Sequence, residues 1–350
     1  MATALHGLDS GPTRDKPIVR DGQLAGVPYQ TVVPPDASGN WVVWVHPYYF
    51  ESLPQTADIP YTREPFTTFL EAGWSITTSA YRENGLIPEK ATQDLMALIR
   101  HLDPDGKVLL LGEASGGASF FHLVEQTDIP VTGGILFGAG WESIAPGSRL
   151  GRPVAPLLLT ANQSEIEPLQ AYQLAAQNRP SAVPVTVAVI ERDGHMMIGR
   201  GEYRAAASAV LQALEPDGDW PTLRNLTLPA TLPAEPNERS TVDGVPVVTG
   251  RVTAIDPAFG NLRTTIGPRD LEALDLDAGQ PFQVDFPGRH ETPLPVRPVA
   301  SWAEPGLEPG DWISFIDADG RLLVARFAAS ASRPFALQPG DSIRVRPEAD

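Results

Sequence analysis

Short apolar segments alternate with amphipathic segments over residues 24–225. Segments this short and apolar are typical of strands that are buried on both faces of a parallel sheet. They comprise residues 41–45, 74–78, 107–111, 134–137, 156–160 and 185–190.

Helical periodicity fills the gaps between these predicted strands. Residues 89–102 place Ala91, Leu95, Leu98 and Ile99 on one face, mostly at spacings of three and four. Residues 118–125, 169–177 and 202–214 show the same pattern. Because strands and helices alternate, the sequence predicts an α/β fold class for this part of the chain.

The pattern changes after residue 225. Residues 226–246 hold four prolines and no periodicity, which predicts a linker. Beyond them, short apolar segments are separated by Gly, Pro and Asp, and they indicate a small all-β, barrel-like module. These segments are residues 247–255, 282–286, 312–316, 322–327 and 342–346. We therefore expect three parts, which are a domain at 1–225, a linker at 226–242 and a β domain at 243–350.

Composition narrows the function classes. The chain has 350 residues, a net charge of −17 and no cysteine. The acidic surface argues against nucleic acid and anionic membranes as partners, and the missing thiols exclude disulfides and a Cys nucleophile. We found no basic and apolar leader, no membrane-length apolar run and no metal-ligand spacing. These features predict a cytoplasmic protein with no cofactor and no metal.

The segment Leu-Gly-Glu-Ala-Ser-Gly-Gly at residues 111–117 lies between the most apolar predicted strand and a helix. A sharp strand–helix turn of this kind exposes a nucleophile that is flanked by glycine two residues before and after. With Gly112 and Gly116 in those places the nucleophile position is Ala114, whose methyl group cannot attack a carbonyl. Ser115 is the alternative nucleophile, but Glu113 would then fill a place that needs a small residue.

A base and an acid are expected further along the chain. His195 follows the last predicted strand of the first domain and is the candidate general base. The candidate acid lies after the strand at 156–160, where Glu165 is preferred and Glu167 is the second choice. Glu142, after the preceding strand, is a weaker third choice.

Aromatic and Met side chains surround the expected site. His46 follows an early strand, in a loop where a backbone N–H commonly completes an oxyanion hole, and we expect it to shape that loop rather than titrate. Tyr48, Tyr49, Trp141 and Met196 lie on loops at the same edge. They favour an apolar or aromatic acyl or alcohol group in the ligand.

On these motifs, together with Tyr81-Arg82, residues 24–225 resemble the α/β-hydrolase family of esterases and lipases. The resemblance implies a three-layer sandwich with a mostly parallel sheet, and an oxyanion hole that includes the backbone N–H of Ser115. Ala114 departs from the family pattern. Either the nucleophile of an active enzyme has been replaced, or the protein is a natural pseudo-hydrolase that keeps the pocket for binding.

Residues 250–266, with Phe259-Gly260-Asn261, resemble the start of the C-terminal domain of the S-adenosylmethionine hydroxide adenosyltransferase and fluorinase family. The resemblance covers residues 243–350. It implies part of a nucleoside pocket at a subunit interface, but the N-terminal partner domain of that family is absent. We therefore expect Phe259 to pack, Asn261-Leu262 to form a turn, and the domain to mediate homo-oligomer formation.

The leading prediction is an esterase of the serine-hydrolase type, acting on a small carboxylic ester or related acyl compound. One alternative is a non-catalytic protein that binds a small ligand in the same pocket. The other is a protein that handles a nucleoside or S-adenosylmethionine through its C-terminal domain. The partners expected are a small acyl substrate and a second copy of the chain.

Overall fold

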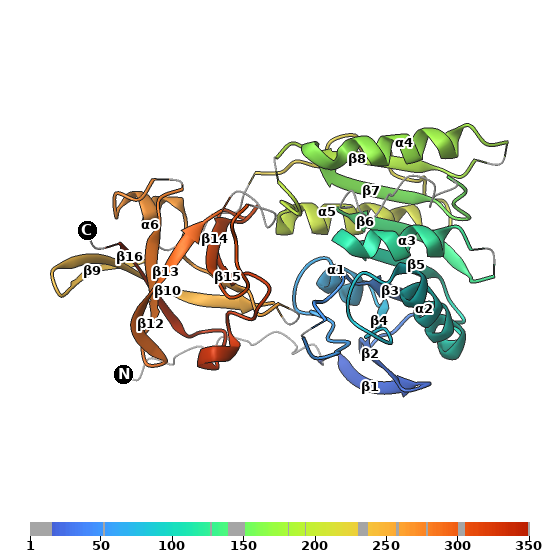
Figure 1. Cartoon of the computed structure of the whole chain (residues 1–350). Helices are drawn as coiled ribbons and strands as arrows, with labels where there is room; N and C mark the ends of the chain where they lie inside the picture. The colour runs from blue at the N-terminus through green and yellow to red at the C-terminus, as the bar shows by residue number, and fades with distance from the viewer. Residues whose placement is uncertain are drawn as a thin grey trace, which may run out of the picture.

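Two sheets of eight strands each organise the chain (Figure 1). The computed structural model describes residues 16–51, 53–126, 128–138, 151–180, 182–192, 194–229, 237–256, 259–277, 279–299 and 305–348. Trp141 and Glu142, both named above, lie outside the described residues. Within those ranges no helix is long and apolar enough to cross a membrane.

The N-terminal sheet is mostly parallel. Its strands run in the order β1-β2-β4-β3-β5-β6-β7-β8, and β2 is antiparallel to both of its neighbours. The pairs from β4 onward are all parallel. The strands are β1 (Ile18–Leu24), β2 (Val27–Val33), β3 (Trp41–Val45), β4 (Ser75–Ser79), β5 (Val108–Glu113), β6 (Val131–Phe137), β7 (Leu157–Asn162) and β8 (Val185–Ile190).

Helices cover both faces of this sheet, which explains why its central strands are apolar throughout. One core cluster joins the sheet to α2 (Pro88–Leu102), α3 (Gly117–Val124) and α4 (Ile166–Gln177). A second cluster joins the other face to α1 (Phe66–Glu71) and α5 (Arg200–Ala213). Phe120 and Phe66 are fully buried in these clusters, and burial of such a side chain contributes roughly 1.5–3 kcal/mol. The α/β class predicted from the sequence is therefore the class observed.

The C-terminal sheet closes on itself like a barrel. Its order is β11-β15-β14-β13-β12-β16-β10-β9, and a further pairing of β11 with β10 joins the two ends, with β9 as an outer edge. Val248, Val284 and Val324 belong to its core. Its elements are β9 (Glu238–Val242), β10 (Val245–Ile255), β11 (Leu262–Thr264), α6 (Pro268–Glu272), β12 (Phe282–Phe286), β13 (His290–Pro298), β14 (Trp312–Ile316), β15 (Leu322–Arg326) and β16 (Ser342–Pro347).

The structure adds elements at places where the sequence predicted none. The hairpin of β1 and β2 lies at the sheet edge, and β1 is largely exposed, so it lacks an apolar pattern. Residues 238–242, predicted as part of the linker, instead form β9, whose polar residues pair with β10. Leu226, at the start of the predicted linker, is buried and donates its N–H to the Val189 carbonyl at 2.9 Å.

Candidate active site

The loops that follow the parallel strands β3, β5, β7 and β8 hold the candidate site residues. Parallel strands end at the same edge of a sheet, so these loops gather at the carboxyl edge. The turn after β5 follows a central strand, which has β3 as one neighbour and β6 as the other.

Ala114 occupies the turn between β5 and α3 with a φ of 47°. A positive φ in a residue other than glycine costs on the order of 1–3 kcal/mol and is common at functional sites. A Cβ added at Gly112 would lie 2.7 Å from Leu136 Cδ1, and one at Gly116 would lie 2.3 Å from the Val45 carbonyl oxygen. The strained residue thus lies midway between two glycines, and at Gly116 a side chain would collide with backbone atoms.

Ser115 connects this turn to the loop after β3. Its Oγ accepts a hydrogen bond from the backbone N–H of Tyr48 at 3.0 Å. An activated hydroxyl needs a base within hydrogen-bond reach. This bond directs the Ser115 oxygen toward the Tyr48 N–H, which belongs to the loop expected to supply an oxyanion donor.

His195 and Glu165 form a hydrogen-bonded pair, with His195 Nδ1 lying 2.6 Å from Glu165 Oε1. The imidazole is 35% exposed and the carboxylate 18% exposed. Glu165 Oε2 is buried without a partner among the described residues, so His195 is the group that offsets the desolvation of this carboxylate. Since Nδ1 is held, Nε2 is the nitrogen left for proton transfer. Glu167, the second choice for the acid, lies exposed on the first turn of α4.

Asn162 positions the loop that carries His195, a role that sequence reasoning missed. This side chain is fully buried at the end of β7. Its Nδ2 donates to the Met197 carbonyl at 3.1 Å, and its Oδ1 accepts from the Met197 N–H at 2.9 Å. The strand that leads to Glu165 therefore also fixes the backbone beside His195. The available signal was an amide residue ending an apolar strand.

His46 is buried in the loop after β3. Its ring lies between Tyr49 and Tyr81, with centroid distances of 4.6 and 4.1 Å. Burial lowers the pKa of His46 from 6.5 to about 4, so the ring is neutral at pH 7. Its nitrogens lie 2.6 Å from the Pro47 carbonyl oxygen and 2.9 Å from that of Ser79. Because the neutral ring has a single N–H, it donates to one of these two carbonyl oxygens.

The other predicted pocket residues divide into exposed and packed groups. Tyr48 is 37% exposed, whereas Tyr49 is buried. Met196 has a φ of 58° and packs against the core cluster on the α1 and α5 face, with its Sδ against Gly138. Met196 thus packs the loop after β8, which carries His195, against the core.

Glu113, directly before Ala114, is a buried carboxylate held by several polar contacts. Its Oε2 accepts from Trp44 Nε1 at 2.8 Å, and the Arg63 guanidinium donates to both carboxylate oxygens at 3.1 and 2.8 Å. Burial alone would lower the pKa of Arg63, but the adjacent Glu113 raises it above its usual value. An ion pair therefore lies under the turn, and the sequence predicted neither partner's role.

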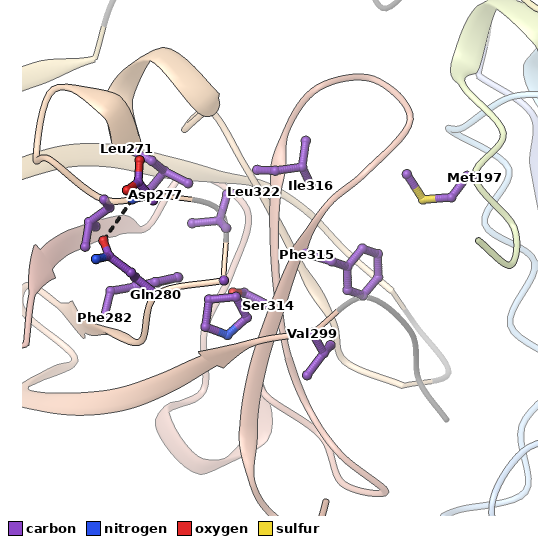
Figure 2. A pocket seen from close by; sticks show the side chains of 13 residues that line it. Met197, Leu271, Asp277, Gln280, Phe282, Val299, Ser314, Phe315, Ile316 and Leu322 are labelled. Atoms are coloured by element: carbon purple, nitrogen blue, oxygen red, sulfur yellow. Dashed lines mark hydrogen bonds between the residues drawn. The ribbon is translucent and has the colours of Figure 1, made fainter. Parts of the chain in front are cut away.

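A cavity of about 260 Å³ lies mainly in the C-terminal barrel (Figure 2). Figure 2 shows apolar side chains such as Leu322 and Phe315 around it, with Met197 approaching from the N-terminal part. Ala114, Ser115 and His195 do not line this cavity. Within the described ranges no group of three His, Asp or Glu residues could hold a metal ion.

No family model matches the chain. It is 36% identical over 97 residues to the fluorinase of Nocardia brasiliensis, covering 28% of this chain and 31% of that protein. It is also 36% identical over 98 residues to the fluorinase of Actinopolyspora mzabensis, covering 28% of this chain and 32% of that protein. The chain therefore spans about a third of the length of these curated relatives.

Solved structures similar to the chain include a predicted CIB-like hydrolase from Thermoplasma acidophilum, with a TM-score of 0.39 and 14% identity, covering 51% of this chain and 89% of that one. A hormone-sensitive lipase from a metagenome library has a TM-score of 0.36 and 16% identity, covering 51% of this chain and 77% of that one. The resemblance to fluorinases predicted from the sequence is confirmed over about 97 residues. The two solved structures are described as a hydrolase and a lipase.

Proposed function

We propose that the N-terminal part is an α/β-hydrolase three-layer sandwich, with a site built to hydrolyse a small carboxylic ester. In this proposal Ala114 stands in the place of the nucleophile. The observation that supports it most directly is the 2.6 Å pair of His195 and Glu165, at the same sheet edge as the strained Ala114 turn.

Each group has a distinct role in this chemistry. A serine at position 114 would bond to the ester carbonyl carbon while His195 Nε2 takes its proton and gives it to the leaving alcohol as the C–O bond breaks. Water would then attack the acyl carbon as His195 Nε2 takes a proton from it, and that proton returns to the serine oxygen as the acid leaves. Glu165 would orient Nδ1 and stabilise the imidazolium. The backbone N–H groups of Ser115 and Tyr48 would stabilise the oxyanion, once the Ser115 hydroxyl releases the second of them. With Ala114 the chain binds the ester but forms no acyl intermediate.

Ala114→Ser tests this proposal. We expect it to be labelled by a fluorophosphonate probe and to hydrolyse 4-nitrophenyl acetate faster than the unaltered chain by roughly 10³-fold or more, since loss of a nucleophile removes most of the catalysis. Ala114→Gly is the matched control, because it accepts the positive φ and carries no hydroxyl.

Ser115→Ala, alone and with Ala114→Ser, separates the two candidate nucleophiles. If the turn presents position 114, the double variant keeps the labelling of Ala114→Ser. Labelling of the unaltered chain that Ser115→Ala abolishes would identify Ser115 as the nucleophile. An inert and unlabelled Ala114→Ser, folded as the parent, would contradict the hydrolase function.

A further inference from the structure

Hydrogen bonds hold the backbone on both sides of Phe259, which lies between β10 and β11. The Gly260 N–H donates to the Asp256 carbonyl at 2.7 Å, and the Asp256 N–H donates to the Asn261 carbonyl at 2.9 Å. The Phe259 N–H donates to Asp256 Oδ1 at 2.7 Å. Gly260 has a φ of 68°, and a Cβ there would lie 2.1 Å from Ser330 Oγ. The backbone of Phe259 is therefore fixed to Asp256 of the barrel by a hydrogen bond.

Phe259 contacts the loop after β3 of the N-terminal part. Its ring meets those of Tyr49 and Phe50 edge-to-face, with centroid distances of 5.8 and 5.9 Å. The neighbouring Tyr48 donates its N–H to Ser115 Oγ. The loop after β3 therefore contacts both Phe259 of the barrel and Ser115, the residue after Ala114.

The barrel also contacts the chain that leaves the His195 loop. The Arg200 N–H, at the first residue of α5, donates to Asp319 Oδ1 at 2.9 Å. A carboxylate at a helix N-terminus satisfies a free N–H and interacts favourably with the helix dipole. The barrel therefore holds both the loop after β3 and the end of the loop after β8, and the Ala114 turn follows a strand between them.

Tyr49 is buried in this contact, but the neighbouring aromatic side chains are incompletely covered. Tyr48 is 37% exposed, and its ring lies edge-to-face with that of Phe50 at 5.7 Å. Phe259 is half-buried. Rings that already meet edge-to-face leave faces and edges on which a further aromatic ring gains the same interaction, whereas an ethyl group gains apolar contact alone.

We propose that Phe259 is a specificity-determining residue, which forms the outer wall of the ester site and binds an aromatic ring of the substrate together with Tyr48. The inference rests on the proposed ester-binding function and adds a substrate class to it, namely aryl esters. It also assigns the barrel a role within the site of its own chain.

The test compares phenyl acetate with ethyl acetate, using the full-length Ala114→Ser chain with and without Phe259→Ala. Each ester is compared with itself, so its intrinsic reactivity cancels. We expect Phe259→Ala to lower kcat/KM for phenyl acetate by about 3- to 10-fold, the range of one aromatic pair, and to change that for ethyl acetate by less than twofold. Equal losses for both esters, or no loss for either, would overturn the proposal.

Two further variants control for folding. Phe335→Ala removes another half-buried barrel ring, whose partners Phe286, His290 and Trp312 all lie in the barrel. This variant should leave the ratio of kcat/KM for phenyl acetate to that for ethyl acetate unchanged. Phe259→Leu keeps an apolar side chain and should still show the selective loss, even if Phe259→Ala unfolds.

Binding to the unaltered chain separates this inference from the proposed function. Calorimetry should show phenyl acetate binding that Phe259→Ala weakens by the same 3- to 10-fold factor. That result with an inert Ala114→Ser would support the wall and contradict hydrolysis. Phenyl acetate binding that Phe259→Ala leaves unchanged would contradict the wall, whatever the activity of Ala114→Ser.

Discussion

At the scale of single residues, the site combines features set by local sequence with one set by distant contacts. The glycines around Ala114 and the histidine after β8 follow from motif spacing, whereas for the acid the sequence left Glu165, Glu167 and Glu142 open. The ion pair of Glu113 and Arg63 joins residues 50 positions apart. No local pattern links them, because only the folded chain brings the segment before α1, which carries Arg63, under the turn.

Glu113→Gln should destabilise the chain. It would leave the Arg63 guanidinium without its carboxylate partner beside Trp44. Breaking a fully buried pair costs about 3–5 kcal/mol, and since the Arg63 side chain is 35% exposed we expect about 2 kcal/mol. Urea unfolding measures this loss. Arg100→Gln, which breaks the exposed pair with Asp128, should cost less than about 1 kcal/mol. If Glu113→Gln lowered the free energy of unfolding by less than about 1 kcal/mol as well, the structural role of the Glu113–Arg63 pair would be contradicted.

His46 should make stability fall in mild acid. Its folded pKa of about 4 lies below its ordinary 6.5, so the unfolded chain binds the extra proton between these values. The contribution is complete above pH 6.5 and is lost as pH falls toward 4, which amounts to about 2 kcal/mol between pH 7 and pH 5. His46→Gln should flatten this part of the pH profile of urea unfolding. An equally steep profile in the variant would contradict the burial of a neutral ring.

At the scale of elements, the strands were predictable from short runs of apolar residues. The helices were predictable from apolar residues that recur at spacings of three and four. Helices α2 to α5 differ from their predicted bounds by a few residues, whereas α1 was not predicted. Strand β1 and the edge strand β9 were missed because exposed polar residues carry no such period. The sequence also does not predict that Asn162, at the end of β7, bonds to the backbone of Met197 in the loop after β8.

Asn162→Leu should disturb the loop that carries His195. It keeps the side-chain volume but leaves the Met197 N–H and carbonyl without their buried partner, which costs about 1–3 kcal/mol. In the Ala114→Ser background we expect a fall in kcat of roughly tenfold with little change in KM, because a displaced base slows chemistry more than binding. Asn178→Leu, at the exposed end of α4, is the control. A rise in KM with kcat unchanged would contradict a positioning role.

At the scale of the whole molecule, the change from an α/β pattern to a barrel pattern was readable from the sequence. The contact between the two parts was not, since Phe259 packs on Tyr49 and Asp319 binds the Arg200 N–H across long sequence separations. The sequence predicted that Phe259 packs but gave no sign of its partner. The expectation that the barrel mediates oligomer formation stays a prediction.

The most direct measurement is the intact mass of the chain after treatment with a fluorophosphonate, for Ala114→Ser with and without His195→Gln. If the Ala114 turn faces the His195–Glu165 pair as a hydrolase site does, Ala114→Ser gains one adduct at position 114. His195→Gln then slows its formation by at least roughly 10³-fold, because the serine loses its base. Absence of the adduct in a folded Ala114→Ser, or an adduct that forms equally fast without His195, would contradict the proposed site.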